Sequence, residues 1–124
     1  MQAIEQFPRQ TRQIPRARRF VRETLKRWGI GREADDVVLL ASELFTNSVV
    51  HGGGEVELRL KLLPRRIRVE VWDGGVAPLP LEPLPEMPGR LSGRGLGIVD
   101  KLAVEWGSGG TTHRTRVWAE LNRG

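Results

Sequence analysis

The sequence contains no cysteine among its 124 residues and only two histidines. Without cysteine there is no disulfide, no thiolate metal site and no cysteine nucleophile. Two histidines are too few for a zinc site made of side chains alone. No apolar run approaches the roughly 18 residues of a membrane-spanning helix, and the first residues lack the basic-then-apolar order of a secretory signal. We therefore expect a cytoplasmic protein without a membrane partner.

The composition is that of a globular protein, with 39% hydrophobic and 28% charged residues. A chain of this length typically forms one domain, so we expect residues 1–124 to share one core. The net charge of +5 suggests an acidic partner, such as a nucleotide or a nucleic acid. The basic residues are scattered, however, and no nucleic-acid-binding motif is present, so we expect no direct contact with nucleic acid.

Apolar residues recur every three or four positions in two segments of the first half. Residues 15–28 form an amphipathic pattern with a basic outer face, and Pro15 suits the first turn of such a helix. Residues 33–51 form a second pattern, which the run of glycines at 52–54 ends. Two helices are therefore predicted here.

Strict alternation of apolar and polar residues follows from position 55. Residues 55–62 and 67–72 predict a hairpin, residues 104–106 and 115–121 predict two more strands, and residues 3–7 can add an edge strand. A third, short helix is expected after Gly93. The sum predicts an α+β two-layer sandwich, in which three helices cover one face of a mostly antiparallel sheet of four or five strands.

Residues 76–92 hold five of the eight prolines and show no periodicity. A loop of this length in a small domain usually serves function, often as a lid. We expect a lid here.

Three polar residues of the second helix, Glu43, Asn47 and His51, are spaced by four residues and share one stripe. They either solvate an exposed face or lie in a packed region where polar groups need partners. The apolar neighbours Leu44 and Phe45 favour the second interpretation.

Asp73 shares its parity with Ile67, Val69 and Val71, so its carboxylate should point toward the helices. It either binds a ligand there or caps the Asp-Gly turn that follows. Both interpretations stay open from this segment alone.

The glycines of residues 93–97 precede the third helix, where free backbone N–H groups can approach a phosphate. The alternative is a flexible hinge. The pattern is not a dinucleotide-binding fingerprint, because a proline-rich loop precedes it, and it lacks the Gly-Lys-Ser/Thr ending of a P-loop.

Taken in order, residues 43–51, 71–75 and 93–97 resemble the N, G1 and G2 boxes of the Bergerat-fold ATPases, which include gyrase and the sensor histidine kinases. The form of the first box, together with residues 93–100 and 117–121, is most similar to the bacterial anti-sigma-factor serine/threonine kinases. The resemblance extends from Arg16 to Leu121.

This resemblance implies a role for each matching residue. Asn47 would bind Mg²⁺, Glu43 would be the general base, and Asp73 would accept the adenine amino group beside Gly75. The remaining residues that it assigns to the nucleotide are His51, Gly93, Arg94, Gly95, Leu96 and Gly97.

The implied function is that of an ATP-binding anti-sigma regulatory factor that uses Mg-ATP to phosphorylate Ser or Thr on an anti-sigma antagonist protein. The implied partners are that antagonist and a sigma factor, and the resemblance also allows a homodimer. The alternative is a non-catalytic module that binds nucleotide and a partner protein. Glu43 separates the two, because phosphoryl transfer needs a base and binding does not.

Overall fold

The computed structural model describes residues 1–74 and 96–124. The predicted lid at residues 76–92 lies outside these residues. The elements, in chain order, are β1 (Gln2–Phe7), the 3₁₀ helix η1 (Thr11–Gln13), α1 (Ile14–Arg27), α2 (Ala34–His51), β2 (Val56–Leu62), β3 (Arg66–Asp73), α4 (Leu96–Leu102), β4 (Glu105–Gly110) and β5 (Thr115–Asn122).

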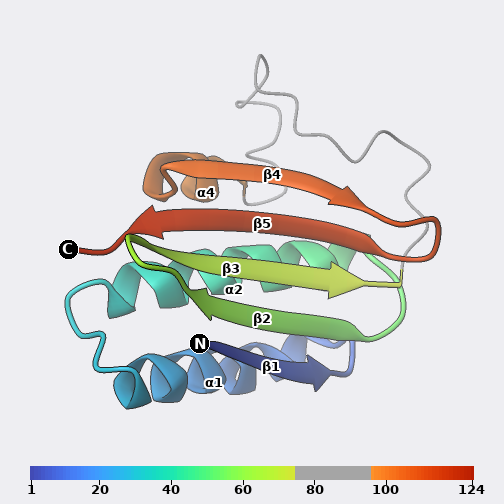
Figure 1. The fold of residues 1–124 in the computed structure, drawn as a ribbon. Coiled ribbons are helices and arrows are strands. Elements are labelled where there is room, and N and C mark those ends of the chain that lie inside the picture. Colours follow the sequence, from blue (N-terminus) through green and yellow to red (C-terminus); the bar gives the residue numbers. More distant parts are fainter. Residues whose placement is uncertain (75–95) are drawn as a thin grey trace.

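The five strands form one sheet with the order β1-β2-β3-β5-β4, and every neighbouring pair is antiparallel. Figure 1 shows α1, α2 and α4 together behind this sheet. None of the described helices covers the opposite side, which we call the open face. The predicted α+β two-layer sandwich is confirmed. No helix within residues 1–74 and 96–124 is long and apolar enough to cross a membrane.

The two long helices begin and end within one residue of their predicted bounds. Pro15 lies in the first turn of α1, and Gly29 follows that helix with a φ of 73°, a value that glycine adopts without strain. At the end of α2, the Gly52 N–H donates to the Ser48 carbonyl at 2.7 Å. These local signals fix where each helix stops.

The core lies between the helices and the sheet. The Phe7 ring contacts the Phe45 ring edge-on, with 5.4 Å between the centroids, and the Phe20 ring in the same manner at 6.2 Å. Helix α2 packs against α1 on one side and α4 on the other, and it also contacts β3. This packing brings the end of α2 beside the end of β3.

Strand β4 is longer than predicted. The sequence predicts a strand over 104–106, whereas β4 continues through Gly107, Ser108 and Gly109 to Gly110. The glycines interrupt the alternation of apolar and polar residues by which a strand is predicted. Packing explains why they are present. A Cβ atom on Gly107 would lie 3.0 Å from the Trp118 ring, and one on Gly109 would lie 3.1 Å from the Arg116 guanidinium. Their missing side chains leave room for two large neighbours on β5.

Candidate functional site

The predicted polar stripe lies on α2, near its end. Glu43 and Asn47 are half-buried, whereas His51, the last residue of the helix, is exposed. Helix α2 buries Leu44 and Phe45 beside them. Glu43 and Asn47 therefore belong to the packed part of the helix, and His51 belongs to its surface.

Asp73, the last residue of β3, is only 6% exposed and lies on the helix-covered face with Val69 and Val71. The Ser48 hydroxyl donates a hydrogen bond of 2.6 Å to its Oδ2 atom. The next backbone N–H, that of Gly74, donates to the Gly53 carbonyl at 2.7 Å. The parity prediction is confirmed, and a residue of α2 holds the carboxylate.

Gly52 allows this close approach of helix and strand. A Cβ atom there would lie 2.4 Å from Asp73 Oδ2 and 2.6 Å from the Ser48 carbonyl oxygen. Both distances are shorter than any van der Waals contact allows. Only glycine at this position lets the end of α2 lie directly against the Asp73 carboxylate.

Asn47 Oδ1 is buried and accepts no hydrogen bond within the part of the chain that the structure describes. A buried amide oxygen without a donor is costly, and such atoms usually have a functional reason. An amide oxygen is also a ligand type that Mg²⁺ accepts. Residues 1–74 and 96–124 contain no group of three or more His, Cys, Asp or Glu side chains that could hold a metal. A divalent cation at Asn47 would therefore need oxygen atoms from a ligand, such as phosphates.

The glycine-rich prediction falls mostly on residues that the structure does not describe. Gly75, Gly93, Arg94 and Gly95 lie outside the described ranges. Leu96 begins α4 and Gly97 is its second residue. Helix α4 packs against α2, the helix that carries the polar stripe.

Three residues at this junction were not predicted from the sequence. Ser48 follows Asn47 directly and so lies off the stripe, and Gly52 was interpreted only as a helix stop. Arg9, which precedes α1, donates from Nη1 to the Val49 carbonyl at 2.9 Å and so supports the end of α2. The only available signal was that a small polar residue and a glycine stand one turn apart before Asp73.

Comparison with known proteins identifies the family to which the chain belongs. Residues 7–120, nearly the whole chain, match a family model described as a histidine kinase-like ATPase domain. No curated protein matches the chain closely enough to compare.

Proposed function

Because the chain belongs to the family of histidine kinase-like ATPase domains, we propose that it is an ATP-binding anti-sigma regulatory factor. In this proposal it uses Mg-ATP to phosphorylate a serine or threonine of an anti-sigma antagonist protein, and it binds a sigma factor. The family match supports ATP binding. The finer role is supported by the resemblance of residues 43–51, 93–100 and 117–121 to the anti-sigma kinases.

The observation that carries the proposal is that two buried oxygen acceptors, the Asp73 carboxylate and Asn47 Oδ1, both lie at the end of α2. Ser48 donates to Asp73 Oδ2, which fixes the carboxylate, and in this proposal that carboxylate would accept a hydrogen bond from the adenine amino group. Asn47 Oδ1, one residue before Ser48, has no donor of its own among the described residues. Adenine and phosphate recognition can thus come from one turn of helix and one strand end.

Asn47 is the residue that would hold the cation. Its neutral oxygen suits a metal whose charge is balanced by phosphates. When bound, Mg²⁺ would neutralise part of the phosphate charge. We expect Asn47→Ala to abolish the Mg²⁺-dependent part of ATP binding. Calorimetry with and without Mg²⁺ measures how much the metal increases ATP affinity. If Mg²⁺ increases the affinity of Asn47→Ala as much as that of wild type, Asn47 does not hold the metal.

Glu43 would act as the general base. It lies one helical turn before Asn47 on the same stripe, so in this proposal its carboxylate would stand near the place where the terminal phosphate meets an incoming hydroxyl. The proton of the serine or threonine hydroxyl would pass to this carboxylate as the oxygen attacks the terminal phosphorus, and the bond from that phosphorus to its bridging oxygen would break to release ADP. A positioned base of this kind contributes about 10²–10⁴-fold to the rate.

The deciding experiment measures transfer and binding in parallel. Single-turnover transfer from labelled ATP to candidate antagonist proteins should fall about 10²–10⁴-fold in Glu43→Gln, while ATP affinity holds or rises because a negative charge is removed. Glu23→Gln, on the exposed part of α1, is the matched control and should transfer at the wild-type rate. Equal rates in Glu43→Gln and wild type would remove Glu43 from the mechanism. ATP binding without transfer to any candidate would favour the non-catalytic module.

Adenine recognition has its own test. Asp73→Asn introduces a donor opposite the adenine amino group, which should cost on the order of 1–3 kcal/mol of ATP binding energy. GTP should lose less, because guanine presents a carbonyl oxygen there. Equal losses for both nucleotides would make Asp73 a structural residue only.

A further inference from the structure

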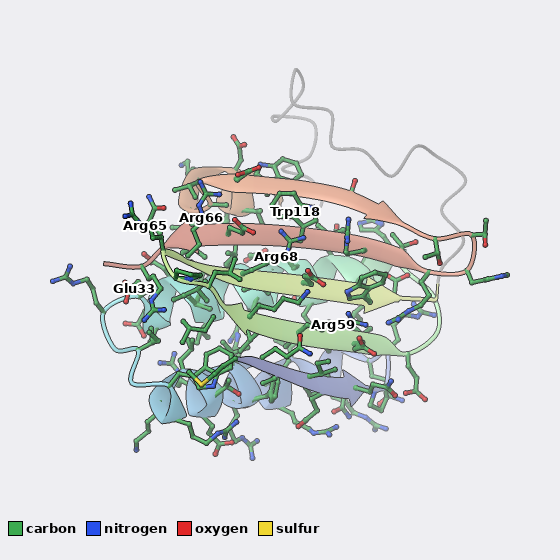
Figure 2. The ribbon with its side chains drawn as sticks, viewed as in Figure 1. Glu33, Arg59, Arg65, Arg66, Arg68 and Trp118 are labelled. Carbon is green, nitrogen blue, oxygen red and sulfur yellow. The ribbon has the colours of Figure 1, made fainter. Side chains whose placement is uncertain are left out.

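The open face of the sheet carries two groups of charged side chains, each built around one tryptophan. We call the first the Trp118 cluster. It consists of Trp118 with Lys61, Arg66, Arg68, Glu70, Glu105 and Glu120. Figure 2 shows Arg59, Arg68 and Trp118 on this side of the sheet. The second, the Trp72 cluster, consists of Trp72 with Glu57, Arg59, Arg114 and Arg116.

The Trp118 cluster is balanced in charge, with three cations and three carboxylates. Its Arg68 guanidinium stacks 4.2 Å from the Trp118 ring centroid. Arg68 pairs with Glu70 at 2.6 Å and with Glu120 at 2.8 Å. Arg66 pairs with Glu120 and Glu105, and Lys61 pairs with Glu70. Every charge in this cluster has a partner of opposite sign, so it offers nothing to a further ion.

The Trp72 cluster is not balanced. Three guanidiniums surround one indole, with their carbons 4.7 Å (Arg59), 4.7 Å (Arg114) and 5.4 Å (Arg116) from the ring centroid. One carboxylate, Glu57, pairs with both Arg59 and Arg114. Within residues 1–74 and 96–124, three positive charges thus face one negative charge in this cluster, which leaves an excess of two.

Arg116 is the cation without a carboxylate among the described residues. Its Nε atom is buried and donates to no acceptor there. A buried guanidinium N–H without an acceptor is unfavourable, and a carboxylate is the acceptor whose geometry fits it best. The excess charge and the missing acceptor therefore coincide at one end of the open face.

We propose that the Trp72 cluster is a docking site for an acidic segment of a partner protein. An incoming Asp or Glu side chain would accept hydrogen bonds from Arg116 and Arg114 beside an aromatic surface. Glu57 and Glu70 interrupt the cations on either side, so the described residues of this face form no continuous basic track for a phosphate backbone. Because cations and carboxylates alternate here, a protein with separated carboxylates fits this face better than a nucleic acid does. The proposal does not depend on phosphoryl transfer.

The four tryptophans of the chain provide the readout. The probe is a synthetic peptide in which Glu alternates with Ser, and the control peptide has Gln in place of Glu. Titration of the ¹⁵N-labelled chain, followed by the indole N–H signals, should shift the Trp72 signal, which Trp72→Phe identifies. Trp72 Nε1 donates to Glu70 Oε1 at 2.9 Å, so a rearrangement of the cluster is visible at that proton. The Trp28 and Trp106 signals should stay in place.

The double variant Arg114→Gln with Arg116→Gln should weaken peptide binding roughly tenfold. The double variant Arg19→Gln with Lys26→Gln removes the same charge from exposed positions of α1 and should bind as wild type does. Unmoved Trp28 and Trp106 signals show that each variant is folded, and Arg116→Gln alone repeats the test with a smaller change.

Three results would overturn the proposal. One is a Trp72 signal that stays in place up to millimolar peptide. Another is an equal shift with the Gln peptide. The third is a single-stranded oligonucleotide that shifts the same signal at lower concentration than the acidic peptide does, which would assign the cluster to nucleic acid. ATP titration of the double variant is a separate control, and unchanged ATP affinity keeps this result distinct from the proposed kinase function.

Discussion

On the helix-covered face of the sheet, β3 presents Ile67, Val69 and Val71 before it reaches Asp73, whereas its open face presents charge or an indole at every position. Both faces bury carboxylates, but they do so differently. A serine hydroxyl holds Asp73, while two cations hold each of Glu70 and Glu120. A cation compensates the charge of a buried carboxylate, whereas a neutral hydroxyl donates a hydrogen bond and adds no charge. The two faces therefore differ in the groups that contact their buried carboxylates, a hydroxyl on one and guanidinium and ammonium groups on the other.

The largest effect is expected from the contact between α2 and Asp73. Gly52→Ala places a Cβ atom against Asp73 and against the backbone of Ser48, which cannot move without distorting the helix. We expect a loss of roughly 3 kcal/mol in the free energy of unfolding, together with loss of ATP binding. Gly31→Ala is the control, since a Cβ atom there meets nothing within 4 Å. Urea unfolding of both variants measures the difference in their free energies of unfolding. Equal values would show that the contact between α2 and Asp73 can accommodate a Cβ atom.

The second prediction is that the ionised Glu70 on the open face stabilises the fold less as the pH falls. Burial alone would raise the pKa of Glu70, but hydrogen bonds from Arg68, Trp72 and Lys61 outweigh it and lower that pKa from 4.5 to about 2. The stabilisation is therefore complete above pH 4.5 and is lost as the pH falls toward 2. The full shift corresponds to at most about 3 kcal/mol, and solvent screening reduces it to on the order of 2 kcal/mol.

Glu70→Gln tests this pH dependence. The variant should be about 2 kcal/mol less stable than wild type at pH 7, and the gap should narrow between pH 4.5 and pH 2. Denaturant unfolding at a series of pH values gives both curves. For the control Glu23→Gln, on the exposed part of α1, the free energy of unfolding should change with pH in the same way as that of wild type. A gap for Glu70→Gln that does not change with pH would mean that packing, and not charge, stabilises this face.

The third prediction returns to the covered face. Ser48→Ala removes the donor to Asp73 and should cost about 1–2 kcal/mol of ATP binding energy, with a smaller preference for ATP over GTP. Ser42→Ala is a matched control on the same helix, because Ser42 is also buried but accepts from Arg18 Nε. Isothermal titration with both nucleotides compares them. Equal losses in the two variants would mean that Ser48 supports the helix and not the recognition of adenine.

The smallest effect is expected at Gly107, which packs against the Trp118 ring on the open face. Gly107→Ala places a Cβ atom about 3.0 Å from the rigid Trp118 indole and should cost about 1 kcal/mol. Gly109→Ala meets only the end of the flexible Arg116 side chain and should cost less. Thermal unfolding ranks the two variants, and the reverse order would contradict the role given to Gly107.

Much of this arrangement follows from local patterns. The helix bounds, the hairpin and the inward direction of Asp73 depend on periodicity, which the sequence carries directly. The contact of Ser48 with Asp73 could not be predicted, because it depends on how closely two elements approach across 25 residues of chain. The length of β4 was missed for a related reason. Gly107 and Gly109 are explained only by Trp118 and Arg116, which lie opposite them on another strand.

The neighbouring positions of Trp72 and Asp73 set a limit on how β3 can change in evolution. One peptide bond separates an indole among arginines from a carboxylate beside α2, and the two side chains leave the strand on opposite faces. Insertion or deletion of a single residue within β3 would exchange the faces, placing an indole against Gly52 and an acid among the guanidiniums. The alternation of the two faces therefore constrains the length of β3 between Arg66 and Asp73.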